Sequence, residues 1–318
     1  MRLCRYRNQD RVSVGLYDES GVVGLADAAA AFAASEGPPD LPESADLLDY
    51  LPPDGKGFAA ARKLAVWSTQ QAGSQLPRVP LDRVELLVPV PRPNKLFLLA
   101  GNYAQHIEEG GGKAAERAET FPYVFMKPPT TTLTDPGRPI TIPRISPDAI
   151  DWELELAVVI GRRCKGVSEA EALRYVAGYT IINDISNRKF KPNAQRKPRE
   201  KDGFFDWLHG KWHDSFCPCG PCVVTPDTIS DPQRLKMLLQ VNGQTQQDSS
   251  TANMIFPVAA VIEFISSFVT LEPGDILSTG TPHGVGSAKG LFLKAGDQIL
   301  GHIDSIGDLR TPVVAEST

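Results

Sequence analysis

One apolar segment that carries two acidic residues constrains the fold of this chain more than any other part of its sequence. Residues 151–160 read DWELELAVVI, and the closing AVVI has no polar alternation, which is typical of a strand covered on both faces. Side chains alternate along a strand, so Glu153 and Glu155 are expected to point the same way. Two like charges in apolar surroundings repel each other and lose hydration, and a hard cation between them relieves both costs.

A third carboxylate is expected beside this pair. The apolar run 179–182 predicts a second strand, and Asn183-Asp184 follow at its end. An all-oxygen site of three carboxylates favours Mg²⁺, Mn²⁺ or Ca²⁺ over zinc. The alternative is that Glu153 and Glu155 lie on the wet face of an edge strand, where charges are common, and the spacing alone leaves this open.

Composition limits the classes of function. The chain has 318 residues with 42% hydrophobic and 22% charged residues, enough for one main domain and a smaller one. A net charge of −5 argues against a nucleic-acid or acidic-membrane partner. No apolar run approaches the ~20 residues of a membrane helix. The start, MRLCRYRNQD, turns polar at once and is no signal peptide, so we expect a cytoplasmic protein.

The cysteines raise the question of a zinc site. Cys217, Cys219 and Cys222 cluster downstream of His209 and His213, but intervening prolines stiffen the segment and no compact second ligand pair follows. The odd total of five cysteines argues against a disulfide framework. Buried thiols in a reducing compartment are the favoured interpretation.

The pattern of elements predicts a β-rich α+β fold. The Pro-rich run 87–93 reads as an extended connector, which divides the chain into a small N-terminal unit, residues 1–90, and a larger unit, residues 91–318. Alternation of strands and helices of the βαβ kind is absent, and GTPHGVG does not match a dinucleotide-binding fingerprint. Strands are expected at 12–17, 22–25, 96–100, 123–126, 151–160, 179–182, 222–225, 238–242 and 275–278, and helices at 26–34, within 44–72, after Asn102, at 169–176 and at 257–268.

Other polar residues are candidates for the same site. His106 and Glu109 are spaced to share one face of the helix expected after Asn102, where a carboxylate can orient a histidine as a general base. Arg188 follows Asp184 and could hold an anionic substrate. For each of these, and for Lys127 and Lys211, a solvated surface charge is the competing interpretation.

The chain resembles the fumarylacetoacetate hydrolase superfamily over roughly residues 94–313. The matching segments are GNYAQHIEE, VFMKP, DWELELAVVIG, VAGYTIINDISNR, GKWHDSFCPCGP, VNGQTQQ and LEPGDILSTGTPHGVG. The resemblance, closest to bacterial acylpyruvases and 2-oxo-hepta-3-ene-1,7-dioate isomerases, implies a mixed β-sandwich roll, a homodimer, and Mg²⁺ or Mn²⁺ as cofactor, with Ca²⁺ able to replace it in vitro.

The resemblance also implies roles for individual residues. The metal ligands are expected to be Glu153, Glu155 and Asp184, and the water-activating dyad His106 and Glu109. Lys211 is expected to polarise the substrate, and Lys127, Arg188 and Thr281 to bind it. Lys189 and Lys191 depart from the family pattern and either indicate an additional acidic group on the substrate or are surface residues.

These residues imply a metal-dependent hydrolase of carbon–carbon bonds in 1,3-diketo or 2-oxo acids, such as acylpyruvate or fumarylpyruvate. The metal would act as a Lewis acid, and Lys211 would stabilise the enolate left by bond cleavage. Oxaloacetate decarboxylation or tautomerisation and the isomerisation or hydration of 2-oxo-enoic diacids pass through the same enolate and stay open as alternatives. A small-molecule binding protein without catalysis is the alternative from another class.

Overall fold

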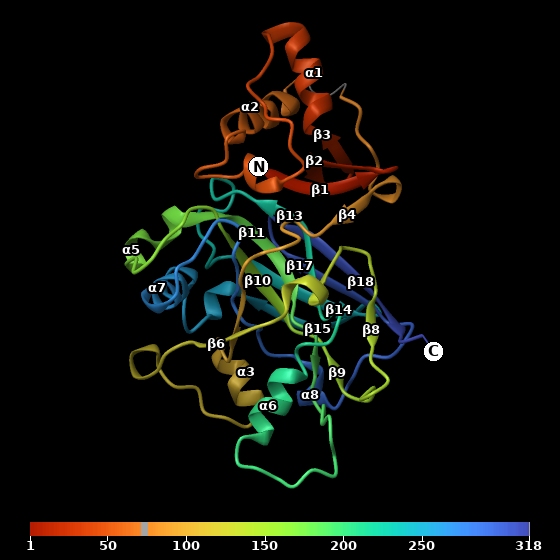
Figure 1. The fold of residues 1–318 in the computed structure, drawn as a ribbon, viewed down its shortest axis with the longest axis vertical. Helices are drawn as coiled ribbons and strands as arrows, with labels where there is room; N and C mark the ends of the chain where they lie inside the picture. Colours follow the sequence, from red (N-terminus) through yellow and green to blue (C-terminus); the bar gives the residue numbers. More distant parts are fainter. Residues whose placement is uncertain (71–75, 318) are drawn as a thin grey trace.

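A strand-rich body with a helical cap at one end makes up the computed structural model, which describes residues 1–70 and 76–317 (Figure 1). The largest sheet of the described residues runs across both predicted units. Its strands follow the order β3 (Gly21–Gly24), β2 (Arg11–Asp18), β1 (Arg2–Asn8), β13 (Cys217–Val224), β11 (Val176–Asn183), β10 (Leu154–Ile160), β16 (Ile276–Ser278), β5 (Leu96–Ala100) and β6 (Tyr123–Met126), with β4 (Glu85–Leu87) on β1 and β7 (Leu133–Thr134) on β13. The predicted β-rich α+β class is confirmed.

A second sheet packs against the first and completes a sandwich. Its order is β15 (Gln244–Ser250), β14 (Lys236–Val241), β17 (Gln298–Ile303), β18 (Gly307–Ala315) and β8 (Ile140–Ile142). Leu154, Leu156 and Val158 of β10 join the core between the two sheets, whereas Ala157 and Val159 join a separate core beneath α1 and α2. The central strand is therefore covered on both faces, as the AVVI run predicts.

Helices lie at the two ends of the sandwich and, with α5 and α7, along one flank (Figure 1). In chain order they are α1 (Leu25–Glu36), α2 (Phe58–Thr69), α3 (Ala104–Glu109), α4 (Pro129–Thr132), α5 (Glu169–Ala172), α6 (Asp202–His209), α7 (Val258–Phe268) and α8 (Gly286–Lys289). Figure 1 shows α3, α6 and α8 gathered at the end opposite α1 and α2. None of the helices in residues 1–70 and 76–317 is long and apolar enough to cross a membrane.

The sequence-predicted strand at 151–160 is wrong in one respect, because the structure interrupts it. β9 (Ile150–Asp151) pairs with β12 (Ser186–Asn187), and β10 begins only at Leu154. The Trp152 N–H donates to the side chain of its neighbour Asp151 (2.8 Å), and the Glu153 N–H donates to the Asn183 side chain (2.9 Å). Side chains thus replace ladder partners at both residues and break the strand.

Several further boundaries differ from the sequence predictions. The expected helix at 169–176 forms as the one-turn α5 continued by a 3₁₀ turn, Leu173–Tyr175, and α6, before Lys211, was not predicted. Residues 71 and 72 of the helical pattern within 44–72 lie outside the described residues. Strands β1, β8, β15, β17 and β18 were not predicted, and β1 pairs with β13 of the larger unit. The division into residues 1–90 and 91–318 stays a prediction.

The cysteines are buried thiols, as expected. All five are free and buried, and three of them lie on β13. Burial raises the pKa of Cys217 and Cys222 to about 12, so these thiols stay protonated at neutral pH. Among the described residues, the one cluster with metal-ligand geometry contains carboxylates and no cysteine.

Candidate active site

Three buried carboxylates converge at the ends of β10 and β11. Leu154 pairs with Asn183 and Glu155 with Ile182, so Asp184, directly after β11, lies level with the two glutamates. Oxygen atoms of Glu153, Glu155 and Asp184 lie within 4.8 Å of one another, and all three side chains are buried. The structure brings together the three residues that strand alternation and position at a strand end had singled out.

Among the three carboxylates, Glu155 is the one with a buried oxygen that lacks a hydrogen-bond partner. One oxygen accepts hydrogen bonds from Ser278 Oγ (2.6 Å) and the Gly280 N–H (2.9 Å), whereas Oε1 is buried without a partner. Burial, followed by the negative charges of Asp184 and Glu153, raises the pKa of Glu155 well above its ordinary value. An unpaired carboxylate oxygen facing two other carboxylates is suited to a cation.

Two buried lysines enclose the same carboxylates. Lys211 Nζ lies 2.8 Å from Glu153 Oε2 and 2.6 Å from Asp184 Oδ2, and Lys127 Nζ lies 2.5 Å from Asp184 Oδ1. Burial opposes ionisation of Glu153, but the charges of Lys211 and Arg188 outweigh it and lower its pKa. Burial likewise opposes the charge of Lys211, but Asp184 and Glu153 raise its pKa above the ordinary value. Lys211 therefore stays a cation.

Aromatic rings hold Lys211 from the other side. Its ammonium lies 5.2 Å from the ring centroid of Phe125 and 5.7 Å from that of Trp207, a residue of α6. The two rings meet edge to face at 5.0 Å. Ring faces attract a cation most strongly where water is excluded, so α6 fixes the position of the lysine. Trp207 thus packs against Lys211.

The donor set fits a divalent cation. Asp151 and the triad supply four carboxyl groups against the three cations Lys127, Lys211 and Arg188, and Glu155 Oε1 lacks a partner. A dication held by Glu153, Glu155 and Asp184 would satisfy the unpaired oxygen and leave the site positive overall, which favours an anionic substrate. The buried acidic triad can therefore bind a metal.

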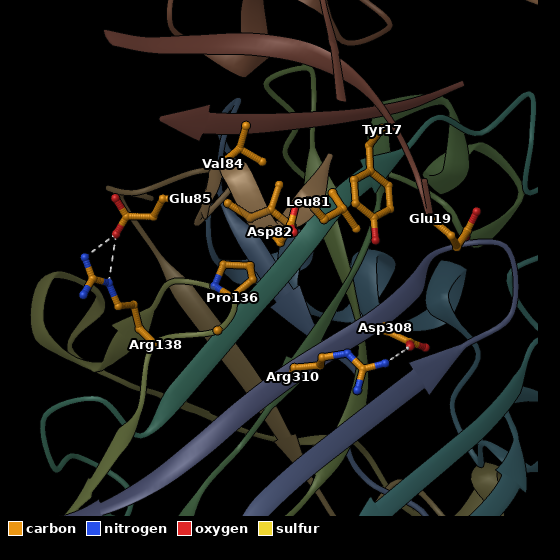
Figure 2. Close-up of a pocket in the computed structure, with 12 residues that line it drawn as sticks. Tyr17, Glu19, Leu81, Asp82, Val84, Glu85, Pro136, Arg138, Asp308 and Arg310 are labelled. Atoms are coloured by element: carbon orange, nitrogen blue, oxygen red, sulfur yellow. Dashed lines mark hydrogen bonds and ion pairs between the residues drawn. The ribbon is translucent and has the colours of Figure 1, made fainter. Parts of the chain in front are cut away.

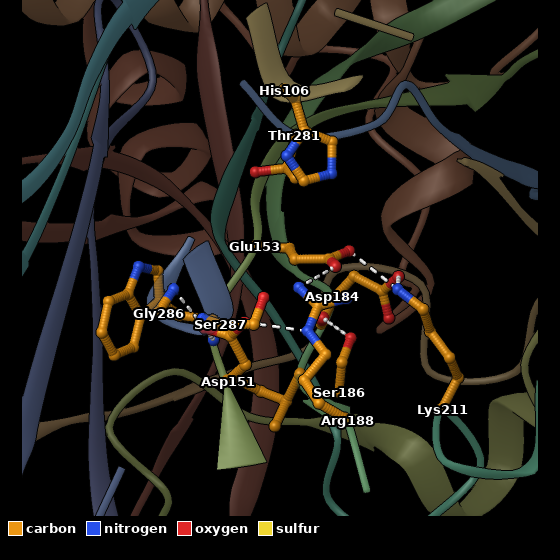
Figure 3. Close-up of polar contacts among 12 residues, drawn as sticks. His106, Asp151, Glu153, Asp184, Ser186, Arg188, Lys211, Thr281, Gly286 and Ser287 are labelled. Carbon is orange, nitrogen blue, oxygen red and sulfur yellow. Dashed lines mark hydrogen bonds and ion pairs between the residues drawn. The ribbon is translucent and has the colours of Figure 1, made fainter. Parts of the chain in front are cut away.

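The predicted histidine–glutamate dyad forms on α3. His106 Nδ1 lies 2.8 Å from Glu109 Oε1, and Glu109 Oε2 accepts the Gly284 N–H at 2.8 Å. Figure 3 shows the His106 ring and Thr281 facing Glu153 from across the site. His106, Glu109 and Arg188 line one cavity of about 540 Å³ together with the segment 285–288. The dyad and the arginine thus share a cavity next to the triad.

Arg188 and Thr281 are held by residues that sequence reasoning did not assign to the site. Arg188 lies 2.8 Å from the buried carboxylate of Asp151 and 2.6 Å from Glu153. Gln247, fully buried, donates to Thr281 Oγ1 (2.8 Å) and accepts the Leu154 N–H (3.0 Å). Both Asp151 and Gln247 lie within matching segments of the sequence, but their partners are more than 30 residues away along the chain.

Two further sequence expectations near the site concern Asn102 and the lysines Lys189 and Lys191. Asn102 does not cap the helix α3 that follows it but joins two loop segments: its amide donates to Phe256 O and Thr279 O, and its oxygen accepts the Phe256 N–H. Lys189 and Lys191 are exposed and outside the cavity lining, and the Lys189 ammonium lies 5.6 Å from the Phe292 ring centroid. Their placement is that of surface residues.

A larger cavity, of about 750 Å³, lies elsewhere on the molecule (Figure 2). It opens between Tyr17 and Leu81 of the N-terminal unit and the strand β18, and its arginines are already paired, Arg138 with Glu85 and Arg310 with Asp308. None of the sequence-predicted site residues lines it. The arginines of this cavity pair with its own carboxylates, and none of its described lining residues has the unpaired buried carboxylate oxygen found at the triad.

Comparisons with known proteins identify relatives across three kinds of reaction. The chain is 36% identical over 278 residues to a mitochondrial oxaloacetate tautomerase of Rattus norvegicus, covering 87% of this chain and 81% of that one. It is 42% identical over 229 residues to a 2,4-didehydro-3-deoxy-L-rhamnonate hydrolase of Sphingomonas sp. (strain SKA58), covering 71% and 75%. A solved structure of a 5-carboxymethyl-2-hydroxymuconate delta-isomerase from Mycobacterium smegmatis superposes with a TM-score of 0.70 at 30% identity, covering 99% of this chain and 100% of that one.

The model of the family described as fumarylacetoacetate (FAA) hydrolase, C-terminal, matches residues 95–314. This range contains the triad, both lysines, the dyad, Arg188 and Thr281, and it agrees with the span of the resemblance seen in the sequence. Members of the family include hydrolases, isomerases and tautomerases. The chain belongs to the fumarylacetoacetate hydrolase superfamily.

Proposed function

We propose that this protein is a divalent-metal-dependent enzyme that hydrolyses a carbon–carbon bond in a 2-oxo acid of the acylpyruvate or fumarylpyruvate type. The observation that carries the proposal is a buried oxygen triad next to the cavity that the bonded His106–Glu109 dyad lines, with Arg188 of that cavity 2.6 Å from Glu153 of the triad. Mg²⁺ or Mn²⁺ suits three carboxylate ligands, and Glu153, Glu155 and Asp184 would hold it. When bound, the metal would supply Lewis-acid polarisation of the 2-oxo acid.

The residues of the chain supply the remaining chemistry. Glu109 orients the His106 ring through Nδ1, so that Nε2 can take a proton from water, and the resulting hydroxide adds to the distal carbonyl. The carbon–carbon bond then breaks, and its electron pair passes to the 2-oxo acid fragment as an enolate. The Lys211 ammonium, raised in pKa and fixed by Glu153 and Asp184, stabilises that negative charge. Protonation of the enolate carbon gives pyruvate beside a second carboxylic acid.

Arg188 and Thr281 would bind the substrate. Arg188 lines the cavity and carries a fixed positive charge, which suits the carboxylate of a 2-oxo acid. Lys127 donates to Ile185 O (3.0 Å) and Phe216 O (2.6 Å) as well as to Asp184, so its three protons all have partners. Lys127 would therefore act on the substrate through Asp184, not by direct contact.

Oxaloacetate tautomerisation is a second candidate, favoured by the 36% identity to a mitochondrial oxaloacetate tautomerase. This reaction needs the same enolate and proton transfer by His106 but no attacking water. Decarboxylation of oxaloacetate and isomerisation or hydration of 2-oxo-enoic diacids also pass through that enolate. A binding protein without catalysis is disfavoured because the dyad, the triad and Lys211 are all in place. A homodimer and a cytoplasmic location stay predictions.

A coupled assay of pyruvate release tests the proposal. Acylpyruvates, fumarylpyruvate and oxaloacetate are each supplied with Mg²⁺ or Mn²⁺, and a parallel series contains EDTA. Metal-dependent pyruvate from the acylpyruvates is the expected result, whereas full activity in metal-free protein would refute the metal role. For oxaloacetate, loss of enol absorbance without pyruvate indicates a tautomerase, and pyruvate with CO₂ indicates a decarboxylase. Silence on every substrate would contradict hydrolysis.

A further inference from the structure

Asp151 is a fully buried carboxylate that none of the steps above uses. Its Oδ1 accepts the N–H groups of Trp152 (2.8 Å) and Gly286 (2.6 Å). Its Oδ2 accepts the Ser287 N–H (3.0 Å) and Arg188 Nε (2.8 Å). Figure 3 shows this carboxylate between Arg188 on one side and the Gly286–Ser287 backbone on the other. One side chain therefore joins two walls of the cavity that the dyad also lines.

The contact with the 286–287 backbone is too close for any other residue type at position 286. A Cβ on Gly286 would lie 2.7 Å from Asp151 Oδ1, 2.2 Å from Leu291 O and 2.9 Å from the Trp152 ring. The absence of a side chain thus lets the segment approach the carboxylate closely enough to donate two N–H groups. Such an approach indicates that the segment and Asp151 form one rigid unit.

The link between Asp151 and Arg188 is fixed at the backbone as well. Ser186 pairs with Asp151 across β12 and β9, and the Arg188 N–H donates to Ala149 O at 2.9 Å. The guanidinium then divides its donors: Nε faces Asp151, and one terminal nitrogen lies 2.6 Å from Glu153. Without Asp151, the whole guanidinium would be free to turn onto Glu153, one of the three triad carboxylates.

We infer that Asp151 is a positioning residue that aims Arg188 at the carboxylate of the substrate and locks the 285–288 segment beside it. This inference rests on the proposed function, because it assumes an anionic 2-oxo acid in the cavity. Because Arg188 pairs with both Asp151 and Glu153, its guanidinium keeps one orientation and does not turn fully toward Glu153. The role predicts an effect on anion binding and on KM, with little change in kcat.

Asp151→Asn is the direct test. The amide NH₂ group faces two donors in either orientation. In place of Oδ2 it removes the acceptor of Arg188 Nε and the Ser287 N–H, and in place of Oδ1 it removes the acceptor of the Trp152 and Gly286 N–H groups. The probe is oxalate, a planar dianion that chelates a divalent metal through two oxygens, titrated by calorimetry in the presence of Mg²⁺. We expect the oxalate Kd and the substrate KM to rise about 10-fold to 100-fold, the range for one charge-assisted hydrogen bond.

Asp275→Asn is a matched control. Asp275 is also fully buried and accepts two backbone N–H groups, from Lys95 (3.0 Å) and Glu272 (2.8 Å), together with a cation, Lys95 Nζ at 2.9 Å. It does not line the cavity. A general cost of burying an amide would affect both variants alike. Equal oxalate affinity in Asp151→Asn, Asp275→Asn and wild type would overturn the inference.

A double-mutant cycle with Arg188→Gln separates positioning from scaffold support. If Asp151 acts through Arg188, Asp151→Asn costs less oxalate affinity in the Arg188→Gln background than in wild type, and any remaining loss comes from its contacts with segment 285–288. Additive losses would refute the role. Should Asp151→Asn fail to fold, Asp151→Glu decides, because it keeps the buried negative charge but displaces it by one methylene from Arg188 Nε and is expected to weaken oxalate binding; unchanged binding would refute the inference.

The oxalate titration needs no turnover, so the two proposals fail separately. Wild-type protein that binds oxalate with Mg²⁺ but turns over none of the panel would refute the proposed hydrolysis, and the comparison of variants would still decide the role of Asp151. Wild-type protein that binds no oxalate would refute the role of Asp151 in anion binding, and the pyruvate assay would still decide hydrolysis.

Discussion

Replacement of Glu155 by glutamine gives the sharpest test of the metal site, because it alters charge and leaves shape unchanged. The carboxylate is fully buried, and one of its oxygens has no partner. In Glu155→Gln, the amide oxygen can keep the hydrogen bonds from Ser278 and Gly280. The amide nitrogen then takes the unpaired position, where it can donate to the neighbouring carboxylates of the triad.

The variant is expected to be more stable than wild type when both lack metal. An unsatisfied buried polar atom costs about 1–3 kcal/mol, so the metal-free gain at pH 8 should be of that order. The sign with pH follows from the raised pKa of Glu155, caused by burial, Asp184 and Glu153. Because the pKa of Glu155 is higher in the folded than in the unfolded protein, the protonated side chain stabilises wild type at pH values below the ordinary glutamate pKa. Wild type loses this stabilisation as the pH rises through the folded pKa. The advantage of the variant therefore grows with pH.

With metal the order should reverse. A ligand at 100 times its Kd stabilises the folded protein by about 2.7 kcal/mol, and Glu155→Gln should lose most of this gain with its metal ligand. The assay is urea unfolding followed by tryptophan fluorescence from pH 5 to 9, with EDTA or with Mg²⁺. Glu263→Gln is the control, since Glu263 accepts the Glu169 N–H (3.0 Å) outside the site. A metal-free variant less stable than wild type at pH 8, or an equal gain from Mg²⁺ in both, would refute the reasoning.

Three further predictions concern the dyad and the lysines. His106→Asn should lower kcat for hydrolysis by about 10²–10⁴ and leave the Mg²⁺ affinity measured by calorimetry unchanged; a parallel loss of both would contradict the dyad role. Lys211→Met should destabilise the metal-free protein by about 3–5 kcal/mol in urea, because Glu153 and Asp184 lose a buried countercharge, and a loss no larger than that of the exposed-site control Lys191→Gln would argue against the Lys211 contacts described. Lys191→Gln should leave the ranking of substrates unchanged, and a changed ranking would show that this exposed lysine reaches the substrate.

The triad could be predicted from sequence because its signals are local. Glu153 directly precedes β10 and Glu155 lies on it, so their spacing of two residues brings both carboxylates to one site, and the end of an apolar run marks Asp184. The dyad follows from helix spacing in the same way, since His106 and Glu109 are three residues apart on α3. In each case the residues that define the geometry lie on one element or at its end.

The residues that position this chemistry could not be predicted, because they act across long separations in the chain. Gln247 reaches Thr281 from the second sheet, and Asp151 accepts N–H groups that are 135 and 136 residues away. The break before β10 has the same origin, since Asn183 takes the Glu153 N–H that a ladder would have used. Neither periodicity nor propensity contains information about such partners. Burial alternates along β17 and β18, but apolar residues such as Leu300 and Val314 also stand at their less buried positions, so the alternation is weak in the sequence; their pairing with β14 and β8 likewise depends on contacts distant in sequence.

The arrangement of charges explains why one site can serve different reactions among its relatives. Lys127 and Lys211 are held by carboxylates of the triad, and Arg188 is shared between Glu153 and Asp151, so the charged groups are fixed before any substrate arrives. An enolate of a 2-oxo acid would meet the same electrostatic field whether it formed by hydrolysis, tautomerisation or loss of CO₂. Under the proposed function, hydrolysis and tautomerisation would differ in whether His106 takes a proton from water or from the substrate. The position of His106 depends on α3 and on Glu109, which accepts the Gly284 N–H.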